Sequence, residues 1–512
     1  MAALLLVASA HMGACAQVKT GRDEVVVLIE DRARNLDPRF AASGYDSKLS
    51  RLVAPGLTSV DALDSVPRPL LAESVEREGP GRYKIVLRRD ARFADGTPVT
   101  AEDVAYTYTS VVDPALHATF AKSFADKGFG PSAVEVVDGR TVRFRMPRPL
   151  ATFESDIEFG IVEKRAALAA GQGGRFPGGS AAGAGPLRVV RMDPDRVELA
   201  PNPYWMDGPP TYRRLVFKTV RDDGARILAL VGGSADLLQN TAAPSPLLLD
   251  TVLQNQELRG QRGRSATWTY LGINCDDPVL RDARVRRAVA MAIDRAGLVA
   301  AKLRGRAVLS TSSLPPSNWA YAPPVRPIVY DPAGARGLLE EAGALGAHIT
   351  IKVSAASKFR LAIARVIAGQ LSAAGFDAEV RAYEFATFLG DVKRGNFQLF
   401  MLQMPEVTEP DFLYALFHSS RIPTRDNPDA GANRFRYRDP ELDALVEHGQ
   451  RVEDRAQRKA IYAQAQQRLA ETLPAVPLWH EDNYAVMRRE LTGYELWPNA
   501  RFSALARVWK VR

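Results

Sequence analysis

The sequence predicts an α/β protein with more than one domain, and three observations lead to this prediction. The chain has 512 residues and 46% of them are apolar, which is enough for several packed cores. Strand patterns and helix patterns alternate from one end of the chain to the other. Residues 349–384 read as strand, helix and strand, which predicts a parallel crossover, the repeating unit of α/β folds.

Strand patterns dominate the first half of the chain. Residues 24–30, EVVVLIE, form a nearly continuous apolar run, which is typical of a strand covered on both faces. Residues 82–90 and 141–147 alternate between apolar and polar side chains, as half-buried strands do. Between them, Asp-Gly at 95–96 predicts a tight turn, and TAED at 100–103 is a capping pattern that predicts the start of a helix.

A glycine-rich stretch at 171–185 separates this block from strand patterns at 187–192 and 213–220. Another alternating run, 265–274, follows a turn-rich segment and opens a third region.

Helix patterns are strongest in that third region. Residues 282–295 predict one helix with Asp282 as its N-cap, and 332–342 predict a second that begins with proline. The helix of the crossover spans 359–374, between strands, and a long helix is predicted over 454–472.

The N-terminus predicts export. Residues 2–10, AALLLVASA, are too few for a membrane-spanning helix, which needs ~20 residues, and they suit the apolar part of a signal peptide. The following MGAC resembles the lipobox of bacterial lipoproteins, so we expect a signal peptide over 1–16 and lipidation of Cys15. Ala-Cys-Ala at 14–16 also fits an ordinary cleavage site, which would release the chain unanchored.

Charge, cysteine and motif content exclude several classes. Lys plus Arg number 67 against 59 Asp plus Glu, a net charge of +8 that is too dilute for a nucleic-acid-binding surface. The two cysteines, Cys15 and Cys275, provide no disulfide framework. No metal-ligand spacing, Walker A loop or nucleophile elbow is present in the sequence. We therefore expect no catalytic residues, metal, cofactor or nucleic-acid partner, and ligand binding is the predicted function.

Six blocks of sequence resemble one known family in its order and spacing. Residues 71–114, LAESVEREGPGRYKIVLRRDARFADGTPVTAEDVAYTYTSVVDP, resemble the signature block of the extracytoplasmic solute-binding proteins of family 5, the peptide- and nickel-binding components of ABC importers. The other five blocks are 183–192, 201–237, 282–295, 330–343 and 455–482. The blocks are spread from residue 71 to residue 482, so the resemblance extends over nearly the whole mature chain.

The resemblance implies the fold of a two-lobed periplasmic binding protein, type II-like, with an extra inserted subdomain. It places 17–50, 186–265 and 481–512 in the first lobe, 51–185 in a subdomain inserted into that lobe, and 266–480 in the second lobe. Two strand crossings between the lobes would let them close over a ligand. The implied mechanism is therefore capture, not catalysis.

The resemblance also implies where a ligand binds. In peptide-binding relatives an acidic residue pairs with the α-amino group, in a motif of Trp, two residues, Asp, two residues and an acidic-Pro pair. Residues 403–410 read QMPEVTEP here, so Glu406 takes the acidic position and Gln403 the aromatic one. Because a carboxylate is kept, a ligand with an ammonium group fits this position.

Further candidates lie near the predicted edge of the cleft. Lys358 and Arg360, in the loop after the strand 349–355, are candidates for binding a ligand carboxylate. Tyr383 and its neighbour Phe385 either line the cleft or pack in the core. The loop after the acidic motif carries His418, Asn433 and Arg434, and loops often carry binding residues.

Three functions remain open from the sequence. In the first, the protein is a monomeric receptor, lipid-anchored on the periplasmic side of the cell envelope, that captures an oligopeptide or peptide-like solute and delivers it to ABC permease subunits of the inner membrane. In the second, the same fold binds a nickel chelate, an oligosaccharide or an opine, which the departures at Gln403 and Glu406 favour. The third is an exported hydrolase with a nonstandard site.

Overall fold

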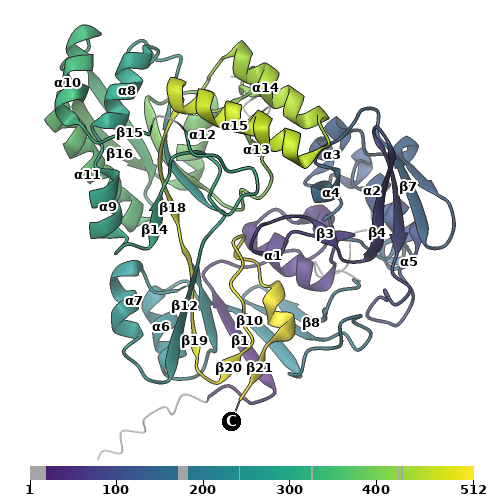
Figure 1. The fold of residues 1–512 in the computed structure, drawn as a ribbon. Helices are drawn as coiled ribbons and strands as arrows, with labels where there is room; N and C mark the ends of the chain where they lie inside the picture. Colours follow the sequence, from purple (N-terminus) through teal and green to yellow (C-terminus); the bar gives the residue numbers. More distant parts are fainter. Residues whose placement is uncertain are drawn as a thin grey trace, which may run out of the picture.

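The computed structural model describes residues 19–170, 183–240, 243–324, 327–424, 426–427 and 431–511. The expected signal peptide with Cys15, and most of the glycine-rich stretch 171–185, lie outside the described residues. The described strands form three main sheets, each in its own part of the molecule (Figure 1).

The first sheet has seven strands in the order β12-β19-β11-β1-β10-β9-β8. Its strands are β1 (Glu24–Ile29), β8 (Leu187–Asp193), β9 (Arg196–Pro201), β10 (Arg214–Thr219), β11 (Leu237–Gln239), β12 (Leu258–Gly263) and β19 (Asn483–Arg488). The central strand β1 pairs in parallel with both β10 and β11, and it is buried from Val25 to Ile29. The continuous apolar run therefore predicted correctly a strand covered on both faces.

Helices and the C-terminal tail cover the two faces of this sheet. One face packs against α1 (Gly44–Val53), β20 (Leu491–Thr492) and the short turn of helix Ser503–Arg507. The last strand, β21 (Trp509–Lys510), pairs with β20. The other face packs against α6 (Asp223–Val231) and α7 (Pro246–Val252).

The second sheet belongs to the segment inserted between β1 and β8. Its four strands, in the order β4-β5-β7-β6, are β4 (Ala72–Gly79), β5 (Arg82–Leu87), β7 (Thr141–Arg145) and β6 (Val134–Val136). Helix α2 (Ala101–Ser110) packs on it, with a capping box in which Asp103 donates its amide to Thr100 Oγ1 at 3.3 Å and accepts from the Thr100 amide at 2.9 Å. The predicted helix start is thus confirmed.

Smaller elements complete this segment. They are β2 (Thr58–Ser59), β3 (Arg68–Pro69), α3 (Ala121–Lys127), α4 (Phe153–Asp156) and α5 (Lys164–Ala169).

The third sheet has six strands in the order β14-β18-β13-β17-β15-β16. These are β14 (Ala307–Leu309), β18 (Ala475–Glu481), β13 (Trp268–Ile273), β17 (Leu399–Met404), β15 (His348–Ser354) and β16 (Asp377–Tyr383). The strands β15 and β16 are parallel and joined by α11 (Lys358–Ala374), which confirms the predicted crossover.

Helices again cover both faces of the third sheet. One core contains residues of α8 (Ala283–Met291), α9 (Arg295–Lys302), α10 (Pro332–Glu341) and α11. The other contains residues of α12 (Phe385–Arg394), α13 (Phe412–Phe417), α14 (Pro440–Arg451) and α15 (Arg455–Thr472).

The prediction of a single helix over 282–295 was wrong. The structure ends α8 at Met291 and starts α9 at Arg295, because the side chain of Asp294 accepts the amide of Gly297 at 2.8 Å and caps a new helix. The local N-cap outweighs the helical pattern that continues through it.

The chain crosses between the first and third sheets twice, and the two crossings lie side by side. One joins β12 to β13 through residues 263–268, and the other joins β18 to β19 through 481–483. Arg262 Nε donates to Asp482 Oδ2 at 2.6 Å, and the Ser265 hydroxyl donates to the Glu481 carbonyl. The molecule therefore has two lobes connected by a paired hinge, the arrangement that permits closure around a ligand.

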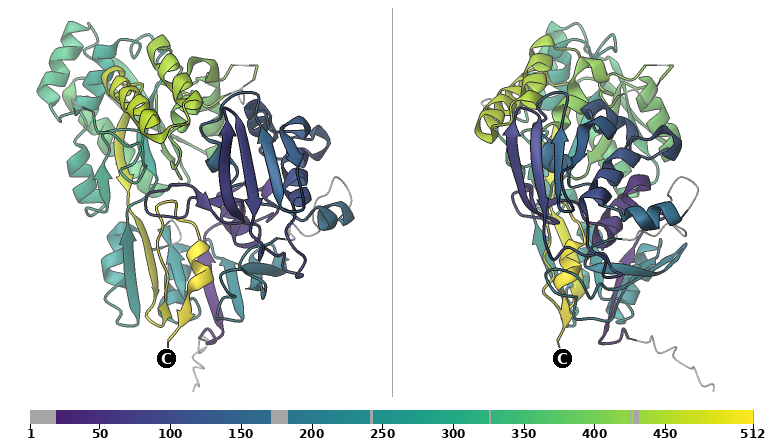
Figure 2. Two further views of the ribbon diagram at one scale, coloured as in Figure 1. Left: turned by 45° about the vertical axis from the view of Figure 1, so that its right-hand side comes forward. Right: turned by 90° about the vertical axis from the view of Figure 1, so that its right-hand side faces the viewer.

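Figure 2 shows how the parts are arranged: the third sheet and its helices lie above the first sheet, and the inserted four-stranded segment lies beside both. Among the residues that the structure describes, no helix combines the length and the apolar character needed to span a membrane.

We expect the stability of the protein to depend on pH because of His480, which lies at the hinge. This buried residue of β18 donates Nδ1–H to the Thr267 carbonyl, 2.7 Å away in the other hinge crossing, and burial lowers its pKa to about 4. The unfolded chain binds this proton near pH 6.5, so stability is full above that value and decreases as the pH falls towards 4. Protonation of His480 alone is expected to lower the unfolding free energy by about 2 kcal/mol between pH 7 and pH 5.

His480→Asn should remove this loss, because its amide can still donate to the Thr267 carbonyl but does not titrate. Urea unfolding of the variant and of the native protein at pH 7 and pH 5 measures this loss of unfolding free energy. The control is His348→Asn, at an exposed histidine whose pKa is raised by Asp377 and whose contribution therefore has the opposite sign. An unchanged pH dependence in His480→Asn would show that another group is responsible.

Candidate functional site

The two lobes and the inserted segment meet at the side chain of Arg501, in the C-terminal tail. Its guanidinium donates to Asp61 Oδ1 at 3.2 Å, to Glu158 Oε2 at 3.2 Å and to Glu406 Oε2 at 3.3 Å. Asp61 follows β2 and Glu158 follows α4, whereas Glu406 follows β17 in the second lobe. One arginine thus connects the lobes through three carboxylates, which we call the Arg501 cluster.

Two members of this cluster, Arg501 and Asp61, keep their charges although little of either side chain is exposed. Only 4% of the Arg501 side chain is exposed, against 28% of Glu406. Burial opposes the charge of Arg501, but Glu158, Glu406 and Asp61 together raise its pKa well above the usual value. Burial likewise disfavours charge on Asp61, but Arg501, together with smaller contributions from Ser503, Arg51 and Asn499, outweighs that effect and lowers the pKa of Asp61. The bridge between the lobes is therefore ionic.

The backbone at Glu406 is in an unusual conformation. Its φ is 53°, in the left-handed region that side chains other than glycine rarely adopt. The next residue, Val407, donates its amide to the Ala266 carbonyl at 2.6 Å, so the loop is tied to the hinge crossing 263–268. Such strained positions occur frequently in binding sites. The loop thus holds the Glu406 carboxylate at the lobe interface.

Lys48 of α1 lies close to the same carboxylate. Burial lowers its pKa, while the charges of Glu406 and Glu30 oppose that effect and Arg501 adds to it. Its ammonium lies 6.0 Å from the centre of the Phe502 ring. Glu406 therefore interacts with two cations of the chain, both from the other lobe.

Two more of the candidate residues contact each other. Arg360 Nη2 donates to Gln403 Oε1 at 2.9 Å, and Gln403 Nε2 donates to Thr269 Oγ1 at 3.3 Å. Arg360 and Lys358 lie in the first turn of α11, and so not in the loop where the sequence placed them. The arginine is thus brought next to the position where the family motif has an aromatic residue.

The aromatic candidates lie at the edge of the sheet. Tyr383 ends β16, half-buried, with the Lys352 ammonium 5.0 Å from its ring centre. Its neighbour Phe385 is exposed at the start of α12. The structure gives neither of them a contact with Glu406.

His418 and Asn433 bind the protein itself. His418 is buried, with Nδ1 2.7 Å from Ser420 Oγ and Nε2 3.1 Å from Glu447 Oε1. Asn433 is fully buried and donates to three backbone carbonyls. Arg434 is half-buried, and its Nε has no hydrogen-bond partner among the residues that the structure describes. The first two side chains hold the loop after α13 in place.

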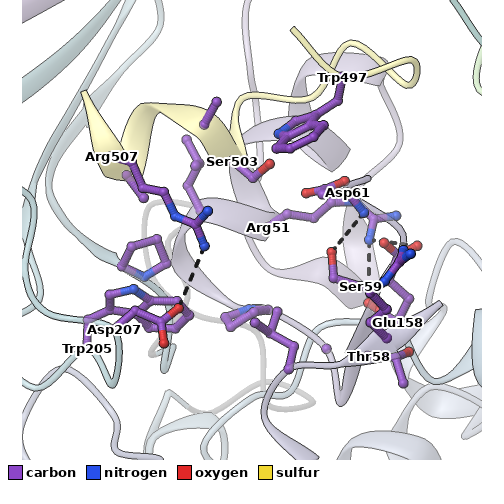
Figure 3. Close-up of a pocket in the computed structure, with 18 of the residues that line it drawn as sticks. Arg51, Thr58, Ser59, Asp61, Glu158, Trp205, Asp207, Trp497, Ser503 and Arg507 are labelled. Carbon is purple, nitrogen blue, oxygen red and sulfur yellow. Dashed lines mark hydrogen bonds and ion pairs between the residues drawn. The ribbon is translucent and has the colours of Figure 1, made fainter. Parts of the chain in front are cut away.

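A cavity of about 300 Å³ adjoins the Arg501 cluster (Figure 3). Asp61, Glu158 and Arg51 group at one end, and Trp205 lies at the other beside the pair formed by Asp207 and Arg507. Trp497 also faces the cavity. Across the described parts of the chain, no group of three or more His, Cys, Asp or Glu residues could hold a metal ion.

Comparison with known proteins agrees with this architecture. The family model of the bacterial extracellular solute-binding proteins, family 5 (middle), matches residues 66–424. A Pseudomonas aeruginosa protein named "probable di/tripeptide-binding protein 5" is 27% identical, over 88% of this chain and 89% of the relative. The glutathione-binding protein GsiB of Escherichia coli is 26% identical, over 97% of this chain and 96% of its own length.

Among solved structures, the ABC transporter substrate-binding protein CtaP of Listeria monocytogenes superposes with a TM-score of 0.85 at 21% sequence identity, covering 96% of this chain and all of CtaP. The resemblance seen in the sequence is thus confirmed, and so is the two-lobed fold that it implied. The chain belongs to the bacterial extracellular solute-binding proteins of family 5.

Proposed function

We propose that this protein is the substrate-binding component of an ABC importer, which captures a peptide or peptide-like solute between its two lobes and delivers it to a membrane permease. The names of two relatives support this proposal, since one is called a di/tripeptide-binding and the other a glutathione-binding protein. The observation that carries it is the position of Glu406, which occupies the acidic position of the peptide-binding motif and lies where the two lobes meet.

In the proposed mechanism, the ligand stabilises the closed form by contacts to both lobes. Glu406 accepts a hydrogen bond from the ligand's ammonium group, sharing its carboxylate with Arg501. Arg360 and Gln403 bind the ligand's carboxylate end, since a guanidinium fits a carboxylate well. Tyr383 and His418 are the remaining candidates for lining the cleft. No bond is made or broken in this cycle, so the protein acts as a receptor and not as an enzyme.

The proposal includes the organisation and place of the protein. The first lobe comprises 17–50, 186–265 and 481–512, the inserted subdomain 51–185, and the second lobe 266–480. The receptor acts as a monomer in the periplasm, with Cys15 as the lipid anchor. Mass spectrometry of the protein extracted from membranes tests the anchor, because an unmodified N-terminus after cleavage would contradict it.

A thermal-shift screen tests the choice of ligand. We expect at least one class of di- to pentapeptide to raise the melting temperature by a few degrees at saturation, because a ligand that binds only the folded state stabilises it by mass action. Nickel–histidine and oligosaccharides form the comparison set. A shift with one of these, and with no peptide, would reject the peptide proposal and favour the second function considered from the sequence.

A further inference from the structure

The inserted segment contacts the second lobe at helices α14 and α15. Arg458 Nη1 donates to the Ala151 carbonyl at 3.2 Å, and the Ala151 amide donates to the Gln450 carbonyl at 3.1 Å. Ser155 Oγ donates to Glu409 Oε2 at 3.0 Å. The segment is inserted between two strands of the first sheet, so it moves with that sheet when the hinge opens. These contacts therefore belong to the closed form.

Two ion pairs flank this contact, one on each side of it. Lys127 pairs with Asp156 within the inserted segment, and Arg458 pairs with Glu409 at 2.6 Å within the second lobe. Because each pair is contained in one of the two parts, both pairs stay together when the lobes separate.

The rim of the contact carries further charges, and these have partners of their own. Three ion pairs cross there from the inserted segment to the second lobe: Glu154 with Arg455, Asp126 with Arg421, and Arg77 with Glu453. Asp126 also pairs with the exposed Lys122.

Asp411, at the start of α13, lies in the same contact without a cation of its own. Its Oδ2 accepts from Gln450 Nε2 at 3.2 Å, whereas its Oδ1 is buried and accepts no hydrogen bond from any described residue. The carboxylate of Asp156 differs, because one oxygen binds Lys127 and the other accepts the Thr152 hydroxyl at 2.6 Å. An ionised carboxylate can only accept hydrogen bonds, and burying it without donors is costly. The surroundings of Asp411 therefore suit a protonated acid.

The charges around Asp411 act in the same direction. Burial raises its pKa most and Glu409 adds to the increase, while the cations of the two ion pairs and the Gln450 amide oppose it without cancelling it. The neighbouring Tyr462 is uncharged, since burial raises its pKa well above the usual value. When the lobes open, residues 151–155 leave Gln450 and water reaches Asp411, so its pKa returns towards the ordinary value of about 3.9.

The pKa of Asp156 is raised as well, chiefly by burial. This acid keeps its partner Lys127 when the lobes open, since both belong to the inserted segment, and its proton affinity therefore changes less between the two forms. Asp411 is thus the acid whose protonation depends most on closure.

We propose that closure of the inserted segment onto the second lobe takes up a proton at Asp411, so that the protein closes more readily as its surroundings become mildly acidic. The proposal rests on the proposed function in one respect only, namely that closure captures the ligand. The closed form holds a proton that the open form releases, so the ratio of closed to open protein increases as the pH falls towards the pKa of the open form. Well above the pKa of the closed form, this ratio no longer depends on Asp411.

Double electron–electron resonance on the ligand-free protein measures the closed and open populations. Spin labels replace Glu102 of α2 and Glu441 of α14, whose side chains are 66% and 67% exposed, after both native cysteines have been changed to serine. From pH 7 to pH 5 the ratio of closed to open protein should rise at least about threefold. Asp411→Asn, which is neutral at every pH, should remove this rise and should favour the closed form already at pH 7.

Two further variants separate titration from loss of contacts. Ser155→Ala removes an uncharged donor from the same interface, so it should lower the closed population at both pH values and keep the rise. Gln450→Leu removes the hydrogen bond to Asp411 Oδ2, so it should move the rise to higher pH, and it keeps the test informative if Asp411→Asn folds poorly.

Two results would overturn the proposal. One is a ratio in the native protein that does not change between pH 7 and pH 5. The other is a rise that survives in Asp411→Asn, which would assign the proton to a different group such as Asp156 or the hinge residue His480, both present in every variant. Neither result bears on the proposed peptide function, because the test contains no ligand.

Discussion

Arg501→Leu is expected to lower the unfolding free energy by about 3–5 kcal/mol, because three carboxylates would lose the buried cation that they share. Asp61 and Glu158 are the most affected, since only 14% and 10% of their side chains are exposed. Urea unfolding followed by circular dichroism at neutral pH measures the change. The matched control is Arg507→Leu in the same tail: that side chain is 72% exposed and its ion pair is long, at 4.0 Å, so we expect a change below about 0.5 kcal/mol.

The effect of Arg501→Leu should depend on pH in a defined direction. In the native protein the pKa of Asp61 is lowered, so its contribution to stability is full above the unfolded value of about 3.9 and disappears as the pH falls through the folded value. Without Arg501, burial, which is the largest influence on Asp61, is opposed only by Ser503, Arg51 and Asn499, so the pKa of Asp61 rises relative to the native protein. Asp61 then gains a proton at a higher pH in the variant than in the native protein, and the difference in unfolding free energy between the two should narrow from pH 7 to pH 4.

A gap that stays constant over this range would show that lost packing, and not lost charge pairing, causes the destabilisation. A loss equal to that of Arg507→Leu would show that the cluster contributes nothing to folding.

Local patterns in the sequence predicted the elements well, since the forces that form them act over a few residues. The buried run 24–30, the capping box at Thr100 and the crossover of 349–384 are all present. The break between α8 and α9 was missed because the helical pattern and the cap at Asp294 are both local signals, and the sequence does not show that the cap outweighs the pattern.

The Arg501 cluster could not be predicted in this way. Arg501 and Glu158 are 343 positions apart, and no periodicity links residues of the tail, the inserted segment and the second lobe. The family motif identified Glu406, but it gave no sign that the chain supplies its own cation there. Arg501 and Arg507 both lie in the tail, and the burial that distinguishes Arg501 from Arg507 is not readable from the sequence. The contact between Arg360 and Gln403 was missed for the same reason, since it depends on how α11 lies over β17.

Glu406→Gln is expected to weaken binding of a peptide with a free amino terminus on the order of 100-fold, which corresponds to about 2.7 kcal/mol. The reason is that the ammonium group would be enclosed between the lobes opposite an amide that carries no charge. Calorimetry with the peptide that gives the strongest thermal shift measures this loss. The control variant is Glu441→Gln, at an acid of α14 whose side chain is 67% exposed and which we expect to leave affinity unchanged.

The same substitution also breaks the ion pair between Glu406 and Arg501, and this second effect has to be separated from the first. The separation uses the same peptide with an acetylated amino terminus. Loss of the bridge between the lobes changes the free energy of closure equally for both ligands, whereas loss of the ammonium contact affects only the free peptide. The ratio of the two affinities therefore reports the contact alone, and we expect it to fall by most of the 100-fold change. If both peptides lose the same factor, Glu406 serves only to hold Arg501 across the lobes, and the ammonium group binds elsewhere.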